Sequence, residues 1–263
     1  MEKASPQSGA PMDSPRYSIV IPAYNEAQRV VATLGKVLAY ADMQQWNLEV
    51  IVVDDGSRDN SAEAISKFAE RDSRVRLVRN PGNRGKGYSV RHGMMQAEGQ
   101  VMLFTDADLS SPIEEAPKLL AALAQGADVA IGSRWLRSEL QTERQPLYRQ
   151  IFSRLFNFAL HLVLGLKFKD TQCGFKAFTA PAANLLFSRQ KIERWGFDPE
   201  LLFLSKKLGL EVREVPVAWA HDERTKMSFF RDGLHMGWEM LKIRWYDLSG
   251  EYAPLPQCAA KRV

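Results

Sequence analysis

Three short polar segments, each directly after an apolar run, carry the residues of this sequence that are best suited to chemistry. They are Ala23–Glu26, Asp54–Ser57 and Asp106–Asp108, and each contains at least one carboxylate. Carboxylates that gather in one place repel each other unless a cation or hydrogen-bond donors offset their charge. Together the three segments therefore predict a site that binds a cation or a strongly polar ligand.

Each segment taken alone has a simpler interpretation, because Asp and Ser are also common at the first position of a helix. Asp59 and Ser111 could fill such a role. This interpretation would have to hold independently at three strand ends, whereas one shared site explains all three. We therefore favour the shared site.

The elements that would position these segments follow from the hydrophobic pattern. Short β-branched and apolar runs predict strands at residues 17–22, 48–53, 74–78, 100–105 and 127–131, with helical patterns between them at residues 26–42, 59–71, 86–98 and 114–125. Strands that alternate with helices of this length predict an α/β fold with a parallel sheet and helices on both faces. Ligands of such sheets bind beyond the carboxyl ends of the strands, where the three acidic segments fall.

The composition excludes several classes of protein. The chain has 263 residues, of which 45% are hydrophobic and 25% charged, as in an ordinary globular protein rather than a disordered chain or a multi-span membrane protein. The net charge of +4 does not by itself argue for a nucleic-acid partner, but it suits an anionic substrate or membrane surface. The two cysteines, Cys173 and Cys258, are too few for a disulfide framework, which favours a reducing compartment.

Two well-known phosphate-binding patterns are missing from the sequence. No Gly-x-Gly-x-x-Gly follows the first predicted strand, and no Walker-type lysine motif occurs. Residues 83–87, Asn-Arg-Gly-Lys-Gly, resemble a phosphate loop in composition, but their glycine spacing does not match a Walker A loop. Dinucleotide-binding and P-loop functions are therefore unsupported.

The order of the motifs P-A-Y-N-E, V-D-D-G-S, N-R-G-K-G and D-A-D resembles that of the family-2 glycosyltransferases. Further along the chain, D-T-Q-C-G-F-K, E-R-W-G-F-D-P-E-L-L and E-V-P-V-A-W are similar to the dolichyl-phosphate β-glucosyltransferases and related polyprenyl-phosphate enzymes of that family. The resemblance covers residues 17 to 252. It implies a GT-A (Rossmann-like) α/β fold with a mostly parallel central sheet flanked by helices, followed by C-terminal amphipathic helices.

The resemblance also implies an activity. The expected reaction is the metal-dependent, inverting transfer of glucose from UDP-glucose to a polyprenyl phosphate, dolichyl or undecaprenyl, with release of UDP. Alternatives within the family are another donor, such as GDP-mannose or a UDP-hexosamine, or a soluble acceptor. A non-catalytic nucleotide-sugar sensor is a further alternative from another functional class.

Roles at the donor site are carried over from the family position by position. Asp106 and Asp108 are the expected catalytic carboxylates, and they would hold Mg²⁺ or Mn²⁺ against the diphosphate. Many relatives carry Gln or His two places further on, where this chain has Ser110, so a third protein ligand for the metal stays open. The remaining residues expected to bind the nucleotide sugar are Pro22, Ala23, Tyr24, Glu26, Asp54, Asp55, Lys86 and Ala107.

A second set of residues is expected to bind the phosphate of the lipid acceptor. Arginine suits this role because its planar guanidinium can bond two phosphate oxygens at once. The set implied by the resemblance is Arg134, Arg149, Ser153, Asn157 and Lys226. Near Lys226 the chain lacks the glycine that relatives carry, so the loop there is expected to bend differently.

Two segments of the chain could contact a membrane surface, and both ends are expected to be flexible. No run of 18 or more apolar residues occurs, but residues 151–168 and 229–246 mix apolar and basic side chains, as interfacial helices do. We expect flexible tails at residues 1–16 and 254–263, a GT-A domain at 17–228 and an amphipathic helix at 229–253. The resemblance implies a peripheral enzyme on the cytoplasmic face of a membrane, with no nucleic-acid partner.

Overall fold

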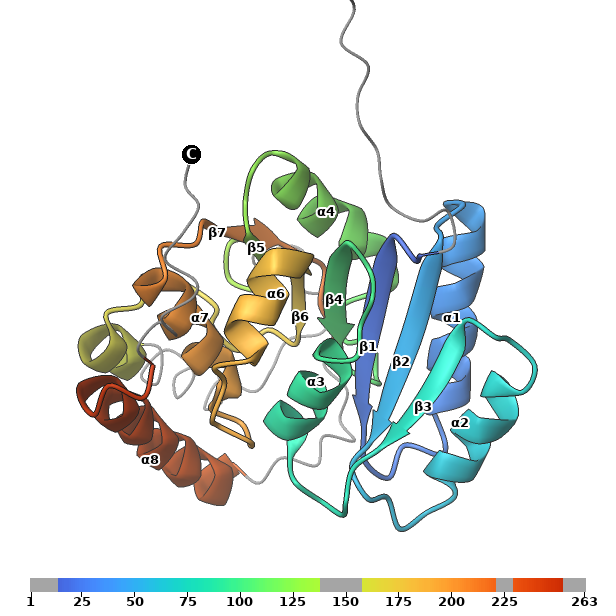
Figure 1. Ribbon diagram of the computed structural model, residues 1–263, viewed down its shortest axis with the longest axis horizontal. Helices are drawn as coiled ribbons and strands as arrows, with labels where there is room; N and C mark the ends of the chain where they lie inside the picture. The colour runs from blue at the N-terminus through green and yellow to red at the C-terminus, as the bar shows by residue number, and fades with distance from the viewer. Residues whose placement is uncertain (1–13, 138–157, 221–228, 253–263) are drawn as a thin grey trace, which may run out of the picture.

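The computed structural model describes residues 14–137, 158–220 and 229–252, and these form one α/β unit around a central sheet (Figure 1). The predicted tails therefore lie outside the described residues, apart from residues 14–16. The strands are β1 (Tyr17–Ala23), β2 (Leu48–Asp54), β3 (Val75–Arg79), β4 (Val101–Thr105), β5 (Val129–Ser133), β6 (Phe175–Thr179) and β7 (Val212–Pro216). The helices are α1 (Val30–Met43), α2 (Ser61–Ala69), α3 (Lys86–Met94), η1 (Ile113–Glu115), α4 (Ala116–Ala124), α6 (Ala180–Phe187), α7 (Phe197–Lys207) and α8 (Phe229–Leu248); residues 158–164 are also helical.

The seven strands form a single sheet in the order β3-β2-β1-β4-β6-β5-β7. The pairs β1–β2, β1–β4, β2–β3 and β5–β7 are parallel, whereas β6 runs antiparallel to both β4 and β5. The mostly parallel sheet confirms the predicted fold class. The five strands expected from the apolar runs are all present, with ends shifted by one or two residues.

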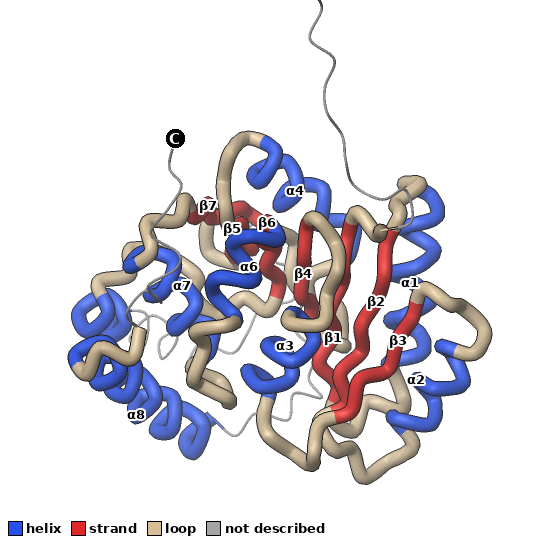
Figure 2. The backbone as a smooth tube through the Cα atoms, in the orientation of Figure 1, coloured by secondary structure: helices blue, strands red, loops and turns tan. Residues whose placement is uncertain are grey.

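Helices cover both faces of the sheet, as predicted (Figure 2). Since successive side chains of a strand point to opposite faces, Ile19 and Ile21 lie in one hydrophobic cluster with residues of α1 and α4. Val20, Ile51 and Phe104 lie in the other cluster, with residues of α3, α6 and α7. The central strands β1 and β2 are therefore buried on both sides, which explains their nearly continuous apolar runs, whereas the edge strands β3 and β7 are only partly buried.

Helix α1 begins at Val30, four residues later than the hydrophobic pattern predicted. The residues before it form a loop in which Asn25 has a φ of +54°, in the left-handed region that asparagine tolerates better than most residues. The Asn25 N–H donates to Ser57 Oγ at 2.9 Å, and its Oδ1 accepts from the Arg58 N–H at 2.8 Å. The start of the helix is thus delayed because this loop binds to the loop after β2.

Helix α8 packs one of its faces on the unit, where Met240 and Ile243 join the same cluster as Leu160 and Leu164 of the helical segment 158–164. Just beyond α8, the fully buried Tyr252 donates its hydroxyl hydrogen to Glu200 Oε1 of α7 at 2.5 Å. A helix is therefore present within the range predicted for it, 229–253, but it ends at Leu248, and the chain just beyond it is anchored by Tyr252. Across the described part of the chain, no helix has the length and hydrophobicity needed to span a membrane.

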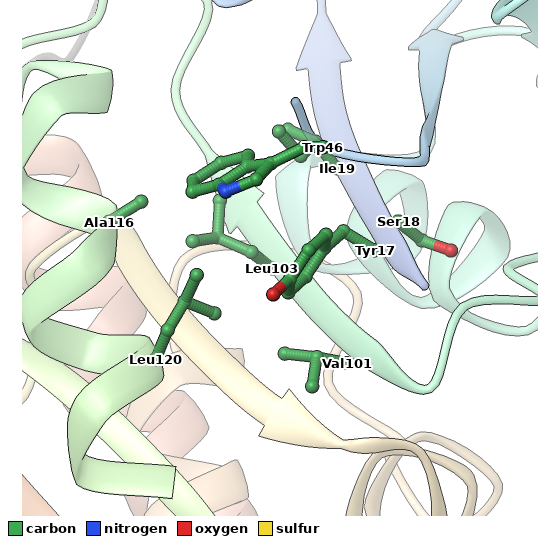
Figure 3. Close-up of a pocket in the computed structure, with 8 residues that line it drawn as sticks. All are labelled: Tyr17, Ser18, Ile19, Trp46, Val101, Leu103, Ala116 and Leu120. Atoms are coloured by element: carbon green, nitrogen blue, oxygen red, sulfur yellow. The ribbon is translucent and has the colours of Figure 1, made fainter. Parts of the chain in front are cut away.

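A small apolar cavity lies at the amino end of β1 and β4 (Figure 3). It encloses about 10 Å³, room for about one water molecule. The ring of Tyr17 lies 5.0 Å from that of Trp46 at its rim. The carboxyl ends of the strands, where the acidic segments lie, are at the opposite end of the sheet.

Candidate active site

The three acidic segments meet at the carboxyl edge of β1, β2 and β4, as their positions in the sequence predicted. Ala23 at the end of β1 is paired in register with Asp54 at the end of β2. The Glu26 N–H donates to Ser61 Oγ at 2.6 Å, so the first loop is also bonded to the start of α2. The Thr33 hydroxyl of α1 donates to the Ala107 carbonyl at 2.6 Å, which ties the third loop to the helix that follows the first.

Asp55 holds the Asn-Arg-Gly-Lys-Gly loop in place. Its Oδ1 accepts from Asn80 Nδ2 at 2.8 Å and from the Arg84 N–H at 2.9 Å, and its Oδ2 accepts from the Gly85 N–H at 2.8 Å. Next to it, Gly56 has a φ of +69°, and a Cβ there would lie 2.6 Å from the Gly82 carbonyl carbon. Only glycine fits this contact, so D-D-G-S and N-R-G-K-G form one interlocked unit.

Asp54 is buried, but it keeps an open side. Its carboxylate is 3.3 Å and 3.4 Å from the Ser57 nitrogen, which are long contacts for a hydrogen bond. A depression of about 520 Å³ adjoins it, with further walls from α2 and from Arg79 at the end of β3. Asp54 can therefore accept a hydrogen bond from a polar ligand that enters this depression.

Asp106 lies between a lysine and a glycine. Lys86 Nζ, from the first residue of α3, is 2.6 Å from Asp106 Oδ1. On the other side, a Cβ on Gly174 would lie 2.1 Å from Asp106 Oδ2, so glycine is required for the carboxylate to rest against the turn before β6. The Asp106 side chain remains 34% exposed, which leaves it accessible to a ligand.

The surroundings of Asp108 disfavour the charged form of its carboxyl group. Burial raises its pKa above the usual range, and the neighbouring charge of Asp106 raises it further, against the opposing hydrogen bond from the Ser110 N–H at 2.9 Å. A cation between the two carboxylates would relieve both effects. Asp106 and Asp108 therefore offer carboxylate oxygens of the kind that a divalent ion binds.

A third protein ligand for such an ion was left open by the sequence. In residues 14–137, 158–220 and 229–252, no group of three or more His, Cys, Asp or Glu side chains is arranged to hold a metal ion. Ser110 contributes its backbone N–H to Asp108.

Arg134 lies at the end of β5 in a bidentate ion pair with Asp170. Its Nε and Nη2 each donate to the Asp170 carboxylate at 2.7 Å, and its backbone N–H donates at 3.0 Å. Burial alone would raise the pKa of Asp170, but the charge and hydrogen bonds of Arg134 outweigh it and hold the pKa below the usual range. The guanidinium also lies 5.4 Å from the Trp219 ring centroid.

The remaining predicted residues divide into two groups. Pro22 and Tyr24 lie partly buried at the end of β1 and just after it, and Glu26 pairs with Arg29. The structure brings these residues to the same edge as Asp54 and Asp106. Four residues predicted to bind the lipid phosphate, Arg149, Ser153, Asn157 and Lys226, lie outside the described residues.

Sequence reasoning gave no role to several charged residues that surround the site. Lys176 of β6 is fully buried, and its Nζ donates to Asp198 Oδ1 at 2.5 Å and to the Cys173 carbonyl at 2.6 Å. Asp170 is also almost completely buried. The available signal was a lysine in the middle of an apolar strand, which is rare unless a buried partner neutralises it.

Several known proteins are similar to this chain in sequence. The model of glycosyl transferase family 2 matches residues 18–187. A dolichyl-phosphate beta-glucosyltransferase of Drosophila melanogaster is 37% identical over 88% of this chain and 76% of its own length. Enzymes with the same name from Trichomonas vaginalis and Homo sapiens are 35% and 32% identical, over 89% and 91% of this chain and 72% and 79% of their own lengths.

Solved structures share the fold at low sequence identity. Mannosyl-3-phosphoglycerate synthase from Rubrobacter xylanophilus superposes with a TM-score of 0.68 at 16% identity, over 94% of this chain and 79% of its own. Glucosyl-3-phosphoglycerate synthase from Mycobacterium tuberculosis was crystallised with Mn²⁺, UDP and glucosyl-3-phosphoglycerate. It has a TM-score of 0.61 at 20% identity, over 92% of this chain and 82% of its own. At these identities the likeness concerns the fold alone.

Proposed function

Because this chain belongs to glycosyl transferase family 2, we propose that it transfers glucose from UDP-glucose to a polyprenyl phosphate at a membrane surface. That it is a glycosyltransferase follows from the family match and from relatives at 32–37% identity over most of their length. The observation that carries the finer proposal is the pair Asp106 and Asp108 at the edge where the three strand-end loops meet, in a chain whose relatives are dolichyl-phosphate beta-glucosyltransferases.

The chemistry suits this arrangement of charges. An oxygen of the acceptor phosphate forms a bond to C1 of glucose as the bond from C1 to the β-phosphate oxygen breaks, and the electron pair leaves with UDP. A phosphate monoester is largely dianionic at neutral pH, because its second pKa is about 6, so the acceptor needs no general base. Direct displacement inverts the anomeric centre and gives a β-linked product from an α-linked donor.

The chain's own residues would position the two anions. Asp106 and Asp108 would hold a divalent cation, which when bound supplies a Lewis acid for the leaving diphosphate. Asp54 would accept a hydrogen bond from the nucleotide base, and Asp55 would act indirectly by fixing the loop that carries Lys86. We also assign Arg134 to the acceptor phosphate, as the resemblance implies, together with Arg149, Ser153, Asn157 and Lys226.

A prenyl acceptor requires contact with a bilayer, and α8 offers a surface for it. Its outward face carries a stripe of exposed apolar residues at helical spacing, and the helical segment 158–164 adds two more. We call this the apolar stripe: Trp238, Leu241, Trp245 and Leu248, with Phe158 and Leu162. Aromatic and apolar side chains next to Lys242 and Arg244 suit an anionic membrane interface, so we propose peripheral binding at the cytoplasmic face.

A donor panel tests the proposed activity. Purified protein would be incubated with a short polyprenyl phosphate and labelled UDP-glucose, UDP-galactose, UDP-N-acetylglucosamine or GDP-mannose, each with Mg²⁺ or Mn²⁺ and with or without chelator. The proposal expects chelator-sensitive label in the lipid fraction from UDP-glucose only. Efficient transfer from GDP-mannose instead would overturn the assigned donor.

A further inference from the structure

Lys86 already places a cation on the carboxylate that a metal ion would need. Its Nζ lies 2.6 Å from Asp106 Oδ1, and its side chain is only 15% exposed. The ammonium also lies 5.8 Å from the Trp195 ring centroid and 6.0 Å from that of Phe197, which shield it from solvent. A divalent ion bound to Asp106 would be repelled strongly by the Lys86 ammonium if that ammonium stayed 2.6 Å from the same carboxylate.

The charge of a second carboxylate, Asp198 of α7, also acts on Lys86. Burial would lower the pKa of Lys86, but the negative charges of Asp106 and Asp198 outweigh it and raise the pKa above its usual value. Asp198 is itself fixed by the buried Lys176, which donates to it at 2.5 Å. Lys86 is thus paired with a carboxylate that is open to ligands, and it also feels the charge of one that is held inside the protein.

We propose that Lys86 is an exchangeable counter-ion that couples metal binding to donor binding. In the donor-free protein it neutralises Asp106. When the metal ion and the donor diphosphate arrive, the ammonium leaves Asp106 to the metal and turns to the diphosphate, while Asp198 keeps it near the site. This inference rests on the proposed function, because it takes the diphosphate of a nucleotide sugar as the second ligand.

The affinity of the protein for the metal ion should depend on whether diphosphate is already bound. Metal alone must displace an ammonium from Asp106, so its affinity for the free protein is reduced. When diphosphate is present, the displaced ammonium pairs with it, and this new pair offsets the free energy lost when the ammonium leaves Asp106. The mutual strengthening of metal and nucleotide binding, which linkage makes equal in both directions, should therefore be larger in the wild type than in a variant without the ammonium of Lys86.

The test measures binding without turnover. Free Mn²⁺ would be followed by electron paramagnetic resonance, and UDP binding by calorimetry with and without Mn²⁺, for the wild type and for Lys86→Met. We expect Mn²⁺ alone to bind Lys86→Met roughly three- to tenfold more tightly, because an opposing charge is gone. UDP in the presence of Mn²⁺ should bind this variant more weakly than it binds the wild type.

Arg84→Met is the matched control, since Arg84 lies in the same loop but pairs with Glu193 at 2.6 Å. It should change the Mn²⁺ affinity less than Lys86→Met does. Coupling in the wild type together with an unchanged or weaker Mn²⁺ affinity in Lys86→Met would overturn the inference and leave the proposed function standing. No UDP binding by the wild type under any condition would overturn the proposed function and the inference together.

Discussion

At the scale of single residues, the charges around the candidate site are held by partners that come from distant parts of the chain. Lys176 and Asp198 form an ion pair whose side chains are 0% and 5% exposed. Such a pair stabilises the fold only while both partners are present, since the loss of one leaves a charge in a medium of low polarity. Buried and exposed ion pairs in this protein should therefore respond differently to substitution.

Replacing Lys176 with methionine should lower the free energy of unfolding by about 3–5 kcal/mol, because Asp198 then stays buried without its closest counter-charge. Urea denaturation followed by circular dichroism measures the loss. Lys118→Met is the matched control, since Lys118 is 44% exposed in its pair with Glu115, and an exposed pair contributes about 0–1 kcal/mol. Equal losses in the two variants would contradict this assignment.

Replacing Asp108 with asparagine should reduce turnover by at least about a hundredfold, because one of the two carboxylates proposed to hold the metal loses its charge. The amide oxygen can still accept from the Ser110 N–H, which lies 2.9 Å from Asp108 Oδ1, so the fold should be retained. Initial rates with UDP-glucose and a polyprenyl phosphate measure the effect, and circular dichroism checks the fold. A folded variant with wild-type turnover would refute the metal role.

The sequence predicted the positions of Asp54, Asp106 and Asp108, because strand ends follow from local hydrophobic patterns. It could not predict that Lys86 pairs with Asp106 or that Asp198 pairs with Lys176. Those contacts depend on the directions of side chains from α3, α7, β6 and the loop after β4, which are decided by packing between elements. The residues were visible in the sequence, but their partners were not.

At the scale of elements, α8 carries apolar side chains both on the face that packs on the protein and on the face that is exposed. Its inward face buries Met236, Met240 and Ile243, and on this face Glu239 accepts from the Gly196 N–H at 2.7 Å. Its outward face carries the exposed residues of the apolar stripe. Because both faces hold apolar side chains, the sequence predicted the helix but could not tell which face packs on the protein.

The apolar stripe should bind lipid vesicles. The double variant Trp238→Ser/Trp245→Ser should lower binding to anionic liposomes by at least about tenfold, since each large apolar side chain contributes about 1.5–3 kcal/mol when it leaves water. Vesicle flotation measures the bound fraction. Met43→Ser on α1, where Met43 is 67% exposed, is the control and should float like the wild type. Undiminished flotation of the double variant would exclude the stripe as the membrane contact.

The link between α7 and the end of α8 should make stability depend on pH. Burial raises the pKa of Glu200 to about 7, against hydrogen bonds from Tyr252 and from the Lys191 and Ile192 N–H groups. Between its unfolded value of 4.5 and about 7, the unfolded chain ionises first, so this group lowers stability as pH rises, by at most about 1.4 kcal/mol per pH unit.

Glu200→Gln cannot ionise and should lose that part of the slope. Urea unfolding at pH 5, 6 and 7 for the wild type and the variant measures the difference, and Glu211→Gln at an exposed position is the control. The variant can be less stable at every pH, because an amide accepts fewer hydrogen bonds than a carboxylate. Parallel pH profiles for the wild type and Glu200→Gln would contradict the raised pKa.

At the scale of the whole molecule, the sheet order explains why motifs from both halves of the chain meet. The sequence predicted parallel strands, because strands alternated with helices, but the direction of β6 is not encoded in its apolar pattern. β6 inserts antiparallel between β4 and β5, with Thr105 paired to Phe175. This insertion brings Gly174 against Asp106 and places the buried Lys176 on a strand between β4 and β5.

The central claim is the transfer of glucose to a lipid phosphate, and the partition of label between two acceptors tests it most directly. Purified protein, Mn²⁺ and labelled UDP-glucose would be supplied with equal amounts of a polyprenyl phosphate and of 3-phosphoglycerate, followed by extraction into organic solvent. The account predicts that the label moves to the organic phase and that chelator prevents this. Label that enters only a water-soluble product, or none in a protein that still binds UDP, would contradict it.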